Sequence, residues 1–185
     1  MKIFNSLTKK KETFIPRVHK KIDLYVCGMT VYDDIHIGHA RTFINFDAII
    51  KFLRFAGWEV NYIRNITDID DKIIEAAREA KISALDLSRK YINEMHKDFD
   101  SLGMMRPNKE PKVSDHINEI IEMIKTLENK GYAYSKEDSD VYFDVIKFKE
   151  YGKLSNRTLN QIESAERIDI DLNKNHEADF VLWKK

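Results

Sequence analysis

Two histidines with a glycine between them are the residues of this chain best suited to bind an anion. His36 and His39 flank Gly38 in the run "CGMTVYDDIHIGHARTF", which extends from Cys27 to Phe43. Imidazoles at helix positions i and i+3 project on the same side of a turn and can donate hydrogen bonds to phosphate oxygens. A glycine lets the backbone approach a ligand without a Cβ in the way. The spacing therefore indicates phosphate chemistry, although surface or capping histidines would show it too.

The single cysteine of the chain opens the same run. Cys27 precedes His36 by nine residues. A cysteine thiolate is a soft ligand that suits zinc, whereas a lone cysteine in a strand is more often buried and inert. No second ligand lies nearby in the sequence, so spacing alone favours the inert alternative. One cysteine forms no internal disulfide, and we expect a cytoplasmic protein on that ground.

The elements around this run predict a strand, a helix and a second strand. "KIDLYVC" (21–27) is apolar and partly β-branched, which is typical of a buried strand. Helical spacing of apolar residues begins at Gly38, and Gly57 is a plausible stop. "WEVNYIRNI" (58–66) predicts the next strand. Such a unit has parallel strands and a right-handed crossover, and its ligands bind beyond the carboxyl ends of the strands. The helix N-terminus at that edge suits phosphate.

Helical patterns follow the second strand. Residues 67–80 carry carboxylates at their front, where these suit the helix dipole. Ser83 with Asp86 resembles a capping box for a helix that ends near Gly103. Residues 114–131 predict a third amphipathic helix, with Ser114 as its N-cap and Gly131 as its stop.

The last third of the chain predicts strands and polar loops. Residues 132–145 are typical of a β-hairpin around a charged turn at 135–140. A polar loop is expected at 171–179, and 179–185 predict a strand that has just begun.

Charge and hydropathy exclude few functions. Lys and Arg total 31 and Asp and Glu total 31, so overall charge gives no argument for nucleic-acid binding, although a local basic face is compatible with it. No apolar run approaches the roughly 18–20 residues of a membrane span, so no membrane partner is expected. The N-terminus lacks the apolar stretch of a secretory signal.

Several strings resemble a known enzyme family. His36-Ile37-Gly38-His39 resembles the signature of class I aminoacyl-tRNA synthetases. Longer strings, at 24–43, 65–74, 95–107 and 179–184, resemble cysteinyl-tRNA synthetase. The resemblance extends over the whole chain and is strongest at 24–74. Met29 departs from the pattern, because the family often carries proline there.

The resemblance implies an α/β fold with a Rossmann-like parallel sheet. Residues 1–113 would be the first half of the nucleotide-binding catalytic fold, and residues 114–178 a connective insertion of helix and β-hairpin. Residues 179–185 would begin the returning strand of the catalytic fold. The second family signature, Lys-Met-Ser-Lys-Ser, is absent, as are the helical and anticodon-reading domains. We therefore expect an N-terminal portion that is inactive alone.

The resemblance also assigns roles to residues. Cys27 would be a zinc ligand, and the zinc would bind the thiolate of the substrate cysteine; the other ligands, a cysteine, a histidine and a glutamate, would come from the later half of the fold. The catalytic pair, His36 and His39, would stabilise ATP phosphates. Other implied contacts are with ATP, from Thr30, His36, Gly38 and His39, and with the amino acid, from Gly28 and Thr67.

Further polar residues near these strings have open roles. Asp68 would lie beside the amino-acid pocket or serve as a carboxylate at a helix front, and Tyr32 fits either the core or a pocket wall. Asp70, Asp71 and Lys72 are expected to be structural. Three arginines fit either tRNA contacts or solvated surface positions: Arg41, Arg54 and Arg64.

The implied activity is that of a cysteine–tRNA ligase. Cysteine carboxylate would attack the α-phosphate of ATP, normally with Mg²⁺, to give cysteinyl-adenylate and pyrophosphate, and the acyl group would pass to the terminal ribose of the tRNA for cysteine. The missing C-terminal part of the same enzyme would be a further partner. Two alternatives remain: a ligase that joins cysteine to a small amine, as in the mycothiol pathway, and a non-catalytic synthetase-like module.

Overall fold

The computed structural model describes residues 1–136, 139–159, 161 and 173–185. These residues form two compact units, residues 15–117 and residues 1–14 with 118–185, and each is described by itself. The loops expected at 135–140 and 171–179 fall partly outside the described residues. In the described part of the chain, no helix combines the length and the apolar character that crossing a membrane requires.

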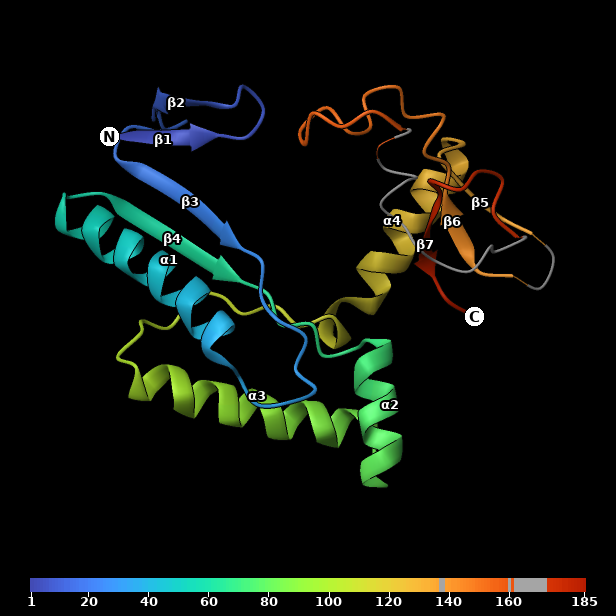
Figure 1. Ribbon diagram of the computed structural model, residues 1–185, viewed down its shortest axis with the longest axis horizontal. Coiled ribbons are helices and arrows are strands. Elements are labelled where there is room, and N and C mark those ends of the chain that lie inside the picture. Colours follow the sequence, from blue (N-terminus) through green and yellow to red (C-terminus); the bar gives the residue numbers. More distant parts are fainter. Residues whose placement is uncertain (137–138, 160, 162–172) are drawn as a thin grey trace. The chain divides into compact units, whose positions relative to one another are not determined.

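The unit of residues 15–117 is organised around two parallel strands. β3 (Lys21–Val26) pairs with β4 (Glu59–Arg64), from Lys21 opposite Glu59 to Val26 opposite Arg64. The helix α1 (Ile37–Phe55) connects them, and Figure 1 shows it running along the pair. The predicted order of strand, helix and strand is thus confirmed, with boundaries that differ by one or two residues.

Burial explains how α1 packs. Its residues Phe43, Ile50 and Leu53 are buried, and the rings of Phe43 and Phe99 pack in a T-shaped arrangement with centroids 5.2 Å apart. Phe99 belongs to α3 (Ala84–Ser101), which Figure 1 shows beyond α1. Ile49, which fits the same apolar pattern, is 45% exposed. The sequence pattern therefore marks a wider face of the helix than the one that is buried.

An extended segment that the sequence pattern did not reveal lies beside β4. The N–H of Arg64 donates to the carbonyl of Lys109 at 3.1 Å, and that of Ile66 donates to the carbonyl of Pro111 at 2.9 Å. Both contacts belong to parallel bridges. Two prolines in "RPNKEP" mask its strand character, because proline is atypical inside a strand.

Side-chain caps start α2 (Asp71–Ala80) and α3, and the cap at Ser83 was predicted. The carboxylate of Asp70 accepts the N–H of Lys72 at 2.9 Å and begins α2. Ser83 Oγ accepts the N–H of Asp86 at 3.0 Å and begins α3. The N-cap prediction for Ser114 is wrong: a short 3-10 helix, Ser114–His116, follows Val113 and leads into α4 (Ile117–Asn129). Serine often caps helices, but this hydroxyl is bonded to a carboxylate elsewhere in the unit.

The other unit contains two antiparallel sheets. β1 (Lys2–Asn5) and β2 (Lys10–Thr13) form a hairpin that the sequence did not predict. The predicted hairpin at 132–145 is present as β5 (Ala133–Ser135) and β6 (Val141–Phe143). β7 (Phe180–Trp183) pairs with β6 and completes a three-stranded sheet.

A buried carboxylate holds the end of that sheet in place. Asp179 is fully buried and accepts hydrogen bonds from the N–H of Val145 at 2.9 Å and from the hydroxyl of Tyr134 at 2.8 Å. Burial raises the pKa of Tyr134 to about 12, and Asp179 contributes to that shift. The tyrosine therefore remains a neutral donor to this carboxylate.

Candidate functional site

The carboxyl ends of β3 and β4 bring four predicted site residues onto adjacent chain segments. Thr30 and Thr67 form a parallel bridge beyond the two strands. The N–H of Val31 donates to the carbonyl of Thr67 at 3.1 Å, and the N–H of Thr67 donates to the carbonyl of Met29 at 3.1 Å. Cys27 and Gly28 lie between this bridge and the end of β3. The strand pairing therefore brings the predicted amino-acid-binding positions, Gly28 and Thr67, to one edge of the sheet.

The pairing shifts by one residue within this edge. Val26 is opposite Arg64, but Thr30 is opposite Thr67, so the β3 side contains one residue more than the β4 side. A strand with such an extra residue loses a regular ladder bond and bends locally, which is frequent next to active sites. Here the shift falls on Cys27, Gly28 and Met29.

Gly28 is required by the close approach of the two chain segments. A Cβ at this position would lie 1.7 Å from the backbone oxygen of Asn65. The N–H of Gly28 donates instead to the side-chain Oδ1 of Asn65 at 2.7 Å. The glycine therefore has a structural reason that is independent of any ligand. Asn65 was not singled out from the sequence, since an asparagine that ends a strand pattern carries no motif signal.

The first turn of α1 unites His36, Gly38 and His39. His36 is the N-cap, and its Nδ1 accepts the N–H of Gly38 at 3.0 Å. His39 Nδ1 in turn accepts the N–H of His36 at 3.4 Å, which completes a reciprocal capping box. The two rings stack with centroids 3.9 Å apart and planes 22° from parallel.

These caps determine what the two rings can do. A nitrogen that accepts an N–H carries a lone pair, so a neutral ring has its proton on Nε2. Both rings therefore have an Nε2–H donor that the caps leave available. Burial, and then the neighbouring His36, lower the pKa of His39. The pair is thus arranged as two Nε2–H donors at the positive end of a helix, which suits a phosphate.

Gly38 is tied to the orientation of His36. A Cβ here would lie 2.8 Å from His36 Cε1 and 2.9 Å from His36 Nδ1. These distances are too short for a carbon contact, so a side chain at position 38 would push the His36 ring away. The glycine between the histidines therefore leaves space for the His36 ring in its capping orientation.

Other polar residues near the site have structural partners. Asp68 is 4% exposed, and its carboxylate accepts the N–H of Ser114 at 3.0 Å and also the Ser114 hydroxyl. It therefore lies at the front of the 3-10 helix at 114–116, not in the first turn of α2. Asp70 caps α2, as expected of a structural residue.

Arg64 is buried, although an arginine is usually expected at a solvated surface position. Its side chain is only 4% exposed and forms an ion pair with Glu110. Its guanidinium lies 5.1 Å from the ring centre of Phe43 and 4.7 Å from that of Phe99. His96 Nε2 lies 2.8 Å from the other oxygen of Glu110. The Arg64 guanidinium is thus part of the core and is not accessible for a contact with tRNA.

The other two arginines differ from each other. Arg54 donates to the carbonyl of Val60 and to Asn108 Oδ1, both at 3.1 Å, so it joins α1 to the segment beside β4. Arg41 is exposed on α1, and its tRNA role stays a prediction.

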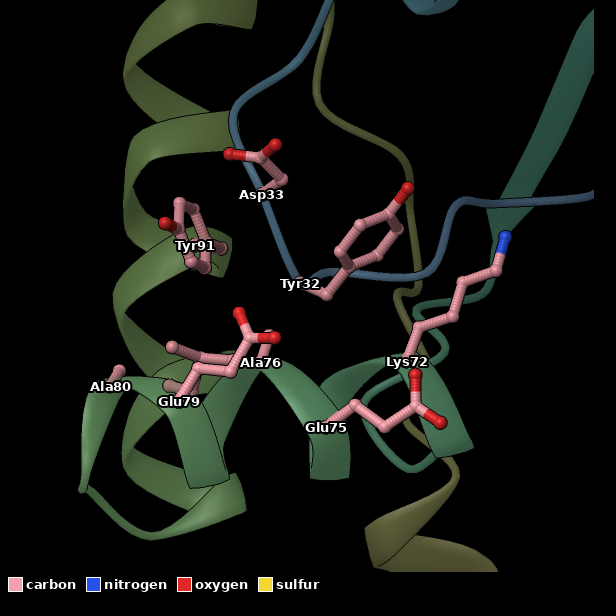
Figure 2. Close-up of a pocket in the computed structure, with 9 residues that line it drawn as sticks. Tyr32, Asp33, Lys72, Glu75, Ala76, Glu79, Ala80 and Tyr91 are labelled. Atoms are coloured by element: carbon pink, nitrogen blue, oxygen red, sulfur yellow. The ribbon is translucent and has the colours of Figure 1, made fainter.

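A pocket of about 640 Å³ lies between the loop after β3, α2 and α3. Figure 2 shows Tyr32 and Tyr91 on opposite sides of it, with Glu79 of α2 between them. The lining is acidic: it contains Asp33, Glu75 and Glu79, with Lys72 as the only basic residue. The Lys72 ammonium lies 5.5 Å from the Tyr32 ring centre. Tyr32 is thus a pocket wall, but carboxylates repel phosphate, so this pocket does not suit ATP.

Comparison with known proteins identifies the family. The model of the catalytic domain of class I tRNA synthetases (C) matches residues 13–185. The chain belongs to this family. A cysteine–tRNA ligase of Pseudoalteromonas translucida is 52% identical over 183 residues, which are 99% of this chain and 40% of that protein. A Shewanella (strain MR-4) cysteine–tRNA ligase is 52% identical over the whole chain, and one of Colwellia psychrerythraea is 51% identical.

The chain thus spans about 40% of the length of these relatives, which is their N-terminal part. A solved structure supports the fold at a greater evolutionary distance. The ternary complex of Agrobacterium radiobacter LeuRS–tRNA–LeuAMS superposes with a TM-score of 0.58 over 72% of this chain and 18% of that one, at 20% identity. The α/β fold of a class I synthetase catalytic domain is therefore shown.

The zinc site expected from the family resemblance is incomplete among the described residues. Cys27 is a free, exposed cysteine. Among the residues that the structure describes, no three histidines, cysteines or carboxylates are grouped as metal ligands would be. These residues do not hold a tetrahedral zinc by themselves.

Proposed function

We propose that the chain forms the cysteine- and ATP-binding part of a cysteine–tRNA ligase. The observation that carries the proposal is the pair of Nε2–H donors on His36 and His39, fixed by a reciprocal cap at the N-terminus of α1. Membership of the family and about 52% identity to cysteine–tRNA ligases support cysteine as the substrate.

In the proposed first step, cysteine carboxylate attacks the α-phosphate of ATP, which normally enters with Mg²⁺. Cysteinyl-adenylate forms and pyrophosphate leaves. His36 and His39 donate hydrogen bonds to phosphate oxygens as these gain charge, and Gly38 lets the backbone approach the nucleotide, with Thr30 as a further phosphate contact. Donors held by the backbone need no reorganisation during the reaction, which is how preorganised sites lower a barrier.

The amino acid is proposed to lie at Gly28 and Thr67, beside the bridge between the strand ends. Cys27 is proposed as one zinc ligand, a role that its soft thiolate and its exposure fit. The described residues provide no complete ligand set for the metal. The acyl group then passes from the adenylate to a hydroxyl of the terminal ribose of tRNA, and AMP leaves.

Residues 15–113 would supply the first half of a Rossmann-like parallel sheet, with the hairpin at 1–14 also assigned to this half. Residues 114–178 are proposed as the connective insertion and 179–185 as the start of the returning strand. A cytoplasmic location is part of the same proposal.

Cysteine-dependent exchange of pyrophosphate into ATP tests the proposal. A protein of the relatives' full length that carries this sequence should catalyse exchange, and its His36→Ala and His39→Ala variants should each lose about 10²-fold or more in rate. The 185-residue chain alone should show none. Arg41→Ala is the matched control for a change on the exposed side of α1. Wild-type rates in both histidine variants would refute the assigned roles.

A further inference from the structure

Asn65 bonds to both segments of the proposed amino-acid site. Its Oδ1 accepts the N–H of Gly28 at 2.7 Å, and its Nδ2 donates to Thr67 Oγ1 at 3.4 Å. The first bond determines how the amide is turned, because a backbone N–H requires an acceptor. The amide nitrogen must then be the atom that faces Thr67.

The bond to Gly28 replaces one that the sheet cannot make. The pairing slips by one residue between Val26 and Thr30, so the N–H of Gly28 falls at the irregularity. A part-buried N–H without an acceptor is costly. The Asn65 side chain supplies that acceptor, and its backbone oxygen occupies the space where a Cβ of residue 28 would be. Asn65 thereby fixes the segment that contains Cys27.

The bond to Thr67 gives its hydroxyl a direction. A hydroxyl has one proton to donate and accepts through its oxygen. Because Thr67 Oγ1 accepts from Asn65, its own proton remains available for an acceptor outside the protein. A carboxylate oxygen of an amino acid is such an acceptor.

We propose that Asn65 is a positioning residue that holds Gly28 and directs the Thr67 hydroxyl as a donor toward the substrate carboxylate; the substrate part of this inference rests on the function proposed above. Asparagine is suited to this position because it has an acceptor and a donor on one rigid group. Aspartate would retain the bond to Gly28 but would accept the Thr67 proton and so reverse that hydroxyl.

Amide hydrogen exchange of the 185-residue chain tests the bond to Gly28 without any activity. In Asn65→Leu, the Gly28 amide should exchange about tenfold faster, whereas Asn65→Asp should retain the wild-type rate. The amides of Val31 and Thr67, which bond to backbone carbonyls, report that the sheet is intact. Asn61→Leu is the control, since the Asn61 side chain, on β4, also bonds across the sheet and donates to Asp23 Oδ1 at 2.9 Å. Unchanged exchange at Gly28 in Asn65→Leu would overturn the assignment.

Steady-state kinetics of a full-length enzyme that carries this sequence test the bond to Thr67. Asn65→Asp should raise the KM for cysteine about tenfold with little change in kcat or in the KM for ATP. Thr67→Val should do the same, and the double variant should resemble Thr67→Val alone, since both changes remove one donor. Additive effects, or a lowered kcat with an unchanged KM, would refute the positioning role. If the wild-type full-length enzyme did not exchange pyrophosphate into ATP, the proposed function would be refuted. The result from amide hydrogen exchange would still stand.

Discussion

Replacing Gly38 with alanine should separate the stability of α1 from the chemistry at its start. The new Cβ would lie 2.8 Å from His36 Cε1. Because His36 is an exposed side chain, its ring can rotate away while the backbone stays in place. That rotation breaks the bond from the Gly38 N–H to His36 Nδ1. The helix loses its cap, and the proposed phosphate site loses one aligned donor.

The two stability effects of this change nearly cancel. Loss of an N-cap costs about 1 kcal/mol, and alanine gains up to about 1 kcal/mol over glycine inside a helix. We therefore expect the free energy of unfolding of Gly38→Ala to lie within about 1 kcal/mol of the wild type. Exchange activity in a full-length enzyme should fall about 10²-fold, as when one preorganised donor is removed.

Gly28→Ala is the matched variant with the opposite outcome. Its Cβ would lie 1.7 Å from the backbone oxygen of Asn65, which no side-chain rotation can relieve. The segments must separate, at a cost of about 3 kcal/mol or more. Urea unfolding followed by tryptophan fluorescence measures both variants, and nitrogen chemical shifts of the imidazoles report whether Nδ1 of His36 still accepts a proton donor. Equal losses of stability in the two variants, or an unchanged His36 tautomer in Gly38→Ala, would refute the reasoning.

Three further predictions concern the surroundings of the site. The pKa of His39 is lowered from its ordinary value of 6.5, so the unfolded chain binds more protons; stability should rise as the pH increases through the folded pKa toward 6.5, and His39→Asn should reduce this slope in urea midpoints taken between pH 5 and 8. Arg64→Met removes one partner of a buried ion pair and should lower the unfolding free energy by about 3 kcal/mol, against less than about 0.5 for the exposed control Arg41→Met; equal effects would contradict the buried role. Asp68→Asn replaces a carboxylate that accepts two donors from Ser114 and should cost about 1–3 kcal/mol, with Ser114→Ala costing less because its N–H bond remains; a neutral Asp68→Asn would count against this account.

The sequence predicted the regular elements well, because apolar spacing and caps are local signals. The β3, α1 and β4 elements, the cap at Ser83 and the hairpin at β5 and β6 all follow from neighbouring residues. Gly57, Gly103 and Gly131, expected as helix stops, all have positive φ.

What the sequence missed depends on contacts between distant residues. The roles of Asn65, Arg64 and Asp68 come from partners 37, 46 and 46 residues away along the chain. No periodicity reports such contacts. The histidine pair was predicted from its spacing and the family resemblance, but the cap that fixes the tautomer depends on backbone angles that spacing does not give.

The bond between Asp68 and Ser114 has a consequence for the order of folding. Helices α1, α2 and α3 are capped by residues next to them, so each first turn can form without distant contacts. The turn at Ser114 is capped by a residue 46 positions earlier. Closing a loop of that length has an entropic cost that contacts between neighbouring residues do not have. We expect this turn to form after the end of β4 is in place, so the turn that precedes α4 forms late in folding.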